Sequence, residues 1–245
     1  LAVAMPKSQQ VELRLTADLD PPGEGTQRRY TLYLPLYNGV DRLEIGVPTG
    51  TRFMPEAPRR EKPLVFYGTS IMHGACASRP GMSITGILGR RLNRPVINLG
   101  FSGNGRMESE VGALLTELDA AVYVVDCLPN MRGAEVRQRA APLVQQLRRA
   151  RPETPILLVE DRTYGYAHLR KASRQRHRAS RLALREAFEQ LTGAGISGIY
   201  YLAGERLLGG DGEATTDGSH PNDLGMVRYA DAYEPLLREI LQAAA

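Results

Sequence analysis

A carboxylate and an imidazole stand three positions apart in the short segment DGSHPND, residues 217–223. Glycine, proline and asparagine indicate a turn here, so Asp217 and His220 are expected to share one tight loop. A carboxylate in that place can orient an imidazole and stabilise its protonated form, as a general base in nucleophilic catalysis requires. The pair therefore predicts a nucleophile elsewhere in the chain that His220 would serve.

Ser70 is the candidate nucleophile. It lies in YGTSIMHG, residues 67–74, where a buried strand is expected to pass into a loop and a helix. A serine at that place can present its hydroxyl at the edge of a sheet, but serine before a helix is also a common N-cap. The segment is not the G-x-S-x-G turn of α/β-hydrolases, because Met72 replaces the second glycine.

Two further loops carry groups that could stabilise a negatively charged oxygen. The first is NLGFSGNG, residues 98–105, which lacks the G-K-[ST] and G-x-G-x-x-G spacings of nucleotide-binding loops. Its Gly103 can offer a backbone amide, and Asn130, after VVDCLP, can offer a side-chain amide. Such donors are what an oxyanion hole needs. The alternative is that both are ordinary turn residues.

All these residues follow short apolar, β-branched runs that alternate with helical patterns. Strands are expected at 64–68, 95–100, 120–127, 155–160 and 198–204, and helices around 82–93, 106–118, 134–150, 168–192 and 223–242. This alternation predicts an α/β fold with a doubly wound, flavodoxin-like sheet of five parallel strands and flanking helices. Ligands of such sheets bind at the carboxyl ends of the strands, which is where the candidate residues would lie.

The N-terminal quarter of the chain has a different pattern. Apolar and polar residues alternate in 11–15, 30–34 and 41–47, which predicts strands, and a linker rich in proline and charge follows at 55–63. We therefore expect a β-rich segment, a partial or ancillary β-sandwich, over residues 1–60. The α/β domain would then span residues 61–245.

Composition argues against a disordered or a fibrous protein. The 245 residues are 42% hydrophobic and 24% charged, which suits an ordinary globular core. The net charge of +4 rests on arginines spread along the chain, and the dense run at 170–181 contains no aromatic residue. We interpret that run as the solvated face of a helix, with His168 and His177 on the surface. Nucleic-acid binding is the weaker alternative.

The apolar runs and the two cysteines bear on the compartment of the protein and on its cofactors. No apolar run is long enough to span a membrane, and LAVAMPKS at the start does not have the form of a signal peptide. Localisation, cytoplasmic or secreted, stays open. Cys76 and Cys127 are expected to be buried thiols, since two cysteines form neither a disulfide framework nor a metal site with paired spacing. The sequence predicts neither a metal nor a cofactor, and an oligomer is compatible with it.

Four blocks in a fixed order resemble the SGNH, or GDSL-type, serine hydrolase superfamily. They are Ser70 in GTS, Gly103 in SGN, Asn130 after the third strand, and the terminal D-x-x-H formed by Asp217 and His220. The first block has GTS where many members have GDS, and the third reads DCLPN in place of GxND. The stretch GTSIMHGACASRPGM is similar to a branch that carries a β-sandwich ahead of the hydrolase domain.

The resemblance implies a role for each block. Ser70 would be the nucleophile, His220 the general base and Asp217 the orienting carboxylate, with Glu213 as its substitute. Three donors would hold the oxyanion: the backbone amides of Ser70 and Gly103 and the side chain of Asn130. The flanking residues expected around the substrate are His73, Arg79 and Met131, with Met107, Cys127, Glu160, Arg162 and Tyr164 nearby.

The function implied is hydrolysis of short-chain O-acyl esters, acetyl esters of carbohydrates first among them. Two alternatives stay open. One is transfer of the acyl group to an alcohol from the same acyl-enzyme. The other is a carbohydrate-binding protein without catalytic activity.

Overall fold

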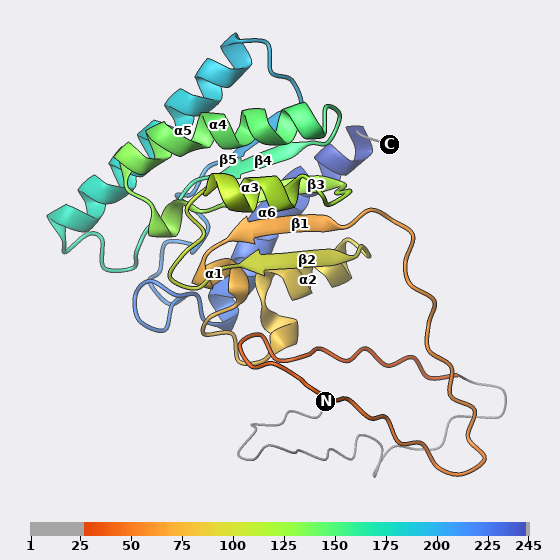
Figure 1. Ribbon diagram of the computed structural model, residues 1–245. Coiled ribbons are helices and arrows are strands. Elements are labelled where there is room, and N and C mark those ends of the chain that lie inside the picture. The colour runs from red at the N-terminus through yellow and green to blue at the C-terminus, as the bar shows by residue number, and fades with distance from the viewer. Residues whose placement is uncertain (1–26, 244–245) are drawn as a thin grey trace.

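The computed structural model describes residues 27–243. Five parallel strands form one sheet in the order β2-β1-β3-β4-β5 (Figure 1). Their bounds are β1 (Leu64–Gly68), β2 (Val96–Gly100), β3 (Val122–Asp126), β4 (Ile156–Val159) and β5 (Ile199–Leu202). The order is that of a flavodoxin-like sheet, so the predicted fold class is confirmed.

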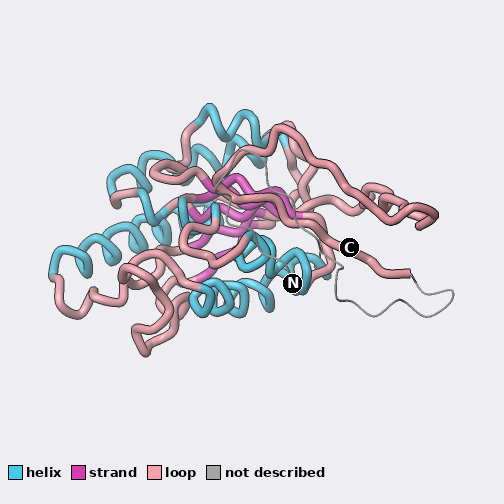
Figure 2. The backbone as a smooth tube through the Cα atoms, turned by 90° about the horizontal axis from the view of Figure 1, so that it is seen from below, coloured by secondary structure: helices cyan, strands magenta, loops and turns pink. Residues whose placement is uncertain are grey.

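Helices cover both faces of the sheet, as Figure 2 shows from below. One face packs against α1 (Ser70–His73), α2 (Ile84–Arg91) and α6 (Asp223–Ala243). The other packs against α3 (Ser109–Leu115), α4 (Gly133–Ala150) and α5 (Lys171–Gly193). Two short 3-10 turns, η1 (Pro80–Met82) and η2 (Leu128–Asn130), follow α1 and β3. Crossovers to both faces are what a doubly wound sheet requires.

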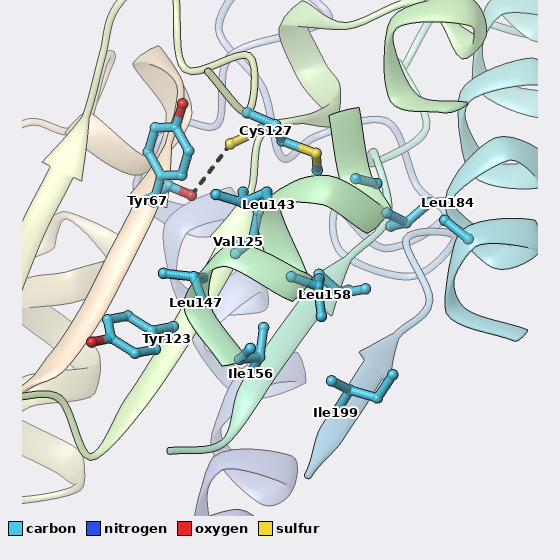
Figure 3. Packing of buried hydrophobic residues seen from close by; sticks show 14 of the residues in the cluster. Tyr67, Tyr123, Val125, Cys127, Leu143, Leu147, Ile156, Leu158, Leu184 and Ile199 are labelled. Carbon is cyan, nitrogen blue, oxygen red and sulfur yellow. Dashed lines mark hydrogen bonds between the residues drawn. The ribbon is translucent and has the colours of Figure 1, made fainter. Parts of the chain in front are cut away.

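Successive residues of each central strand fill the two cores. Val65 and Tyr67 of β1 face the cluster under α3, α4 and α5, whereas Leu64 and Phe66 face the cluster under α2 and α6. Figure 3 shows the first cluster, in which the Cys127 thiol lies 3.7 Å from the Tyr67 carbonyl oxygen. Because both faces of the central strands are buried, nearly all their residues are apolar, and this made the strands recognisable in the sequence.

The described part of the N-terminal segment differs from the expectation. Residues 27–62 form neither helix nor strand, so the strands predicted at 30–34 and 41–47 do not form, while the one at 11–15 lies outside the described residues. Tyr30 and Leu34 remain 57% and 51% exposed. Alternation can only produce a strand where a neighbouring strand and a core are available, and here the chain runs apart from the sheet (Figure 1). The division at residue 60 stays a prediction.

Two expectations about single residues were wrong. Cys76 is exposed, because it lies in the tight turn that follows α1, with φ at +68°. His177 is buried, at 3% exposure, because α5 turns this residue toward the Asp161 carboxylate. Cys127 is buried and His168 is exposed, as expected. Within residues 27–243, no helix has both the length and the apolar character that crossing a bilayer demands.

Candidate active site

The candidate residues gather where the order of the strands reverses. β1 pairs with β2 on one side and with β3 on the other, and Gly68, Gly100 and Asp126 end the three strands in register. The chain leaves this edge toward α1 from β1 and toward η2 from β3. In open α/β sheets such a switch point is the usual place for a ligand.

Ser70 is the first residue of α1, and its hydroxyl is not used as the helix cap. The N-cap is Thr69, whose side-chain oxygen accepts a hydrogen bond of 3.3 Å from the Ile71 backbone N–H. Ser70 is 9% exposed and its Oγ lies 3.1 Å from Nε2 of His220. The capping alternative raised by the sequence therefore applies to the neighbouring threonine, and the Ser70 hydroxyl is available to an imidazole.

His220 lies between Ser70 and a carboxylate. Its Nδ1 is 2.7 Å from Oδ2 of Asp217, so Asp217 and not Glu213 is the carboxylate that contacts the imidazole. A proton on Nδ1 donated to Asp217 leaves the Nε2 lone pair to accept from the Ser70 hydroxyl. The structure thus brings together three side chains from residues 70 to 220 in one continuous chain of hydrogen bonds.

Asp217 is held as an anion by its own turn. Its Oδ1 accepts the backbone N–H groups of Ser219 at 2.9 Å and of His220 at 2.7 Å. Partial burial opposes ionisation, but these hydrogen bonds and the His220 side chain outweigh it and lower the pKa of Asp217 to about 2. The carboxylate therefore stays charged, and able to stabilise an imidazolium, near neutral pH.

Two of the expected oxyanion donors, Gly103 and Asn130, meet at one loop, residues 101–105. Gly103 has φ at +78°, and a Cβ atom built there would meet nothing within 4 Å, so its backbone borders open space. The Asn130 side-chain amide donates to the Asn104 carbonyl at 2.7 Å, which ties η2 to this loop. An amide nitrogen carries two hydrogens, and the second one is left for a ligand.

The three residues expected to bind substrate lie in three separate environments. His73 stacks on Tyr37 with ring centroids 4.0 Å apart and donates to the Leu36 carbonyl. Arg79 lies 3.6 Å from the Asp223 carboxylate, at the start of α6. Met131 is fully buried in the core cluster, where packing accounts for it.

Tyr37 was missed by sequence reasoning. Its hydroxyl lies 3.4 Å from Ser102 Oγ, next to Gly103, while its ring covers His73. The described N-terminal segment thus contacts both the helix of Ser70 and the glycine loop. A tyrosine between two predicted strands carries no signal of such a role, because the contact depends on how a distant segment folds back.

The residues after β4 lie beneath the surface. Glu160 is fully buried and accepts hydrogen bonds from Arg185, Tyr201 and the Gly204 backbone. Burial opposes its ionisation, but these donors lower its pKa. Arg162, 2% exposed, contacts the turn of His220 from below. Tyr164, Met107 and Cys127 are buried as well.

Comparisons with known proteins identify the family of the chain. A model of the GDSL-like lipase/acylhydrolase family matches residues 61–238. The chain belongs to this family. A second model, described as the N-terminus of SGNH-hydrolase-type esterases, matches residues 2–53. The resemblance inferred from the four blocks is thereby confirmed at the level of the family. No curated protein matches the chain.

Solved structures share the fold. A protein described as a GDSL-like lipase from Bacteroides ovatus is 37% identical, with a TM-score of 0.72 over 74% of this chain and 54% of that one. A salicylyl-acyltransferase from a tetracycline biosynthetic pathway is 21% identical, with a TM-score of 0.64 over 76% of this chain and 56% of that one. A family two carbohydrate esterase from Clostridium thermocellum, in complex with cellohexaose, is 16% identical, with a TM-score of 0.61 over 77% and 67%. The chain thus spans little more than half the length of the first two.

Proposed function

We propose that this hydrolase is a serine esterase that removes short O-acyl groups, acetyl above all, from carbohydrate or similar polar alcohols. The observation that carries the proposal is the relay of hydrogen bonds from Ser70 Oγ to His220 Nε2, at 3.1 Å, and from His220 Nδ1 to Asp217, at 2.7 Å. A serine hydroxyl alone is a weak nucleophile, and such a relay is the usual means of activating it.

The reaction follows from these contacts. As the Ser70 oxygen bonds to the ester carbon, its proton passes to His220 Nε2, and Asp217 stabilises the imidazolium. The carbonyl π electrons move to the carbonyl oxygen, which the amides of Ser70 and Gly103 and the side chain of Asn130 would stabilise. When the intermediate collapses, the C–O bond to the alcohol breaks and His220 returns the proton to it. Water then attacks the acyl-serine by the same route.

The surroundings favour a polar alcohol as the leaving group. The His220 and Asp217 side chains are 33% and 52% exposed, so the base is reached from the surface and not through an apolar tunnel. Arginine, serine and asparagine side chains surround the turn and the glycine loop, with Tyr37 as an aromatic neighbour. Polar side chains in these places can hydrogen-bond the hydroxyl groups of such an alcohol.

Hydrolysis rates with graded substrates test the proposal. Acetyl, butyryl and octanoyl nitrophenyl esters are compared with acetylated xylan, using the wild type and Ser70→Ala. We expect the acetyl ester to be hydrolysed fastest and acetate to be released from the xylan. Ser70→Ala should have lost both activities. A preference for the octanoyl ester, or an active Ser70→Ala variant, would overturn it.

Acyl transfer is the second function that an observation favours, because the salicylyl-acyltransferase shares the fold. The same acetyl donor is therefore offered with and without an acceptor sugar, and the products are separated. Acetate alone supports hydrolysis, whereas an acetylated acceptor at the expense of acetate supports transfer. A carbohydrate-binding protein without catalytic activity would release neither product, and its Ser70 would not react with a fluorophosphonate.

A further inference from the structure

Arg162 contacts Ser219, the residue directly before His220 in the turn that carries the proposed base. Its Nε donates to the Ser219 backbone carbonyl at 3.2 Å, and its Nη2 donates to Ser219 Oγ at 2.5 Å. Ser219 in turn donates its backbone N–H to the Asp217 carboxylate at 2.9 Å. One guanidinium therefore fixes both the main chain and the side chain of the turn's central residue.

The guanidinium is itself fixed from below. Arg162 is 2% exposed, and its Nη1 donates to the Asp161 carboxylate, which is fully buried. The Tyr164 ring lies under it, with the guanidinium carbon 4.4 Å from the ring centroid. Burial disfavours the charge, but the neighbouring Asp161 outweighs it and raises the pKa of Arg162. A planar cation in such a setting has few other orientations to adopt.

From these contacts we propose that Arg162 is a positioning residue: it sets the register of the Asp217–His220 turn so that the imidazole meets Ser70. The inference depends on the proposed function, since it assumes that His220 is the base. The inference goes beyond the proposed function, because it states that Arg162, in the loop after β4, aligns the Asp217–His220 turn, which follows β5. A shift of the imidazole by even 1 Å is enough to cost roughly 10²-fold in rate.

Lysine tests this role, because it keeps the positive charge against Asp161 but lacks the planar fork that grips Ser219 at two points. We expect Arg162→Lys to lower kcat on the order of 10–10²-fold with KM unchanged, and to slow fluorophosphonate labelling of Ser70 by a similar factor. Ser219→Ala, which removes only the Oγ contact, should lower kcat less than Arg162→Lys does.

Arg181→Lys is the matched control. Arg181 lies beside the same loop, donating to the Asp161 carbonyl at 2.9 Å and to Thr163 at 2.8 Å, but it has no contact with Ser219. A thermal midpoint is measured for each variant. If Arg162→Lys loses no more activity than Arg181→Lys, or only in proportion to a lower midpoint, the proposal is wrong.

A double mutant separates positioning from a general loss of structure. In a His220→Ala background the turn no longer carries a base, so Arg162→Lys should reduce the residual rate no further. A second full loss would contradict positioning. The downfield proton resonance of the His220 Nδ1–H bond to Asp217 supplies a readout that does not depend on catalysis. It should weaken or shift in Arg162→Lys and stay in Arg181→Lys, even if Ser70→Ala were to disprove the esterase.

Discussion

The turn that carries His220 and the loop that carries Gly103 reach the candidate active site from the two edge strands, β5 and β2. The turn is held from several sides: by Arg162 at Ser219, by the Gly165 N–H at the Gly218 carbonyl, 3.0 Å away, and by its own hydrogen bonds to Asp217. At Gly103, in contrast, a Cβ atom would have no neighbour within 4 Å.

The loop is nevertheless fixed on both sides of that glycine. The Asn104 N–H donates to the Phe101 carbonyl at 2.9 Å, and Asn130 donates to the Asn104 carbonyl. Gly105 approaches β1 so closely that a Cβ atom would lie 2.0 Å from the Gly68 carbonyl oxygen. The His220 turn and the Gly103 loop thus differ in how much open space each one borders. The turn of His220, the proposed base, is held from several sides, whereas the loop of Gly103 leaves an open position where the proposed reaction would place a substrate oxygen.

Removing Ser70 or His220 should have the largest effect. Each single alanine substitution is expected to lower kcat by roughly 10⁴–10⁶, because either one breaks the relay. The double variant should be little worse than the single ones, since the two residues act as a unit. Steady-state rates with an acetyl ester check this. Additive losses in the double variant would mean that the contact of 3.1 Å is not used in the reaction.

Asp217→Asn should follow, with a loss on the order of 10⁴ in kcat. The amide keeps the shape but cannot stabilise an imidazolium, and it can hold the imidazole in the wrong tautomer. Glu213→Gln is the control, because Glu213 was the other carboxylate suggested by the sequence, whereas the His220 Nδ1 contact goes to Asp217. Equal losses in the two variants would contradict the assignment of Asp217.

Asn130→Ala should cost less, roughly 10²–10³ in kcat with little change in KM, because an oxyanion donor acts mainly in the transition state. The substitution also frees the Asn104 carbonyl, so the thermal midpoint is measured beside the rate. Full activity in a folded Asn130→Ala variant would show that the proposed oxyanion depends on backbone amides alone. It would also sharpen the contrast between the His220 turn and the Gly103 loop.

The same contrast explains what the sequence could predict. The proximity of Ser70, Asp217 and His220 was predictable, because Ser70 follows a recognisable strand and the other two lie in a turn whose residue types have few other uses. Arg162 was only expected near the rim, since its grip on Ser219, 57 positions away, has no local signal.

The strands predicted at 30–34 and 41–47 do not form, for the opposite reason. The alternation at 30–34 is genuine, but a strand also needs a partner, and the pattern cannot state whether one is present. In the sheet, by contrast, β1 to β5 each lie against a neighbour and between two layers of helices, so their apolar runs were sufficient evidence.

Asp126 lies between the 3-10 turn of Asn130 and α6, the helix that follows the His220 turn. Its substitution should have the smallest effect on activity. Asp126 ends β3, and it accepts a hydrogen bond of 2.7 Å from Tyr233 of α6. Burial raises the pKa of Asp126 from 3.8 to about 7, although the Tyr233 hydroxyl partly offsets it. The folded protein therefore binds this proton more tightly than the unfolded chain does.

The sign of the pH effect follows. The stabilising contribution is complete below about pH 4, the pKa of an exposed aspartate, and is lost as the pH rises from there to about 7. Asp126→Asn stays neutral and still accepts from Tyr233. Its free energy of unfolding relative to the wild type should rise through that window, by up to ~4 kcal/mol, and stay level above it, while kcat is unchanged. Denaturant titrations at pH 5 and pH 8 measure this. Parallel pH profiles would show that another group titrates, and a loss of kcat would show that the connection between the 3-10 turn and α6 depends on the acid itself.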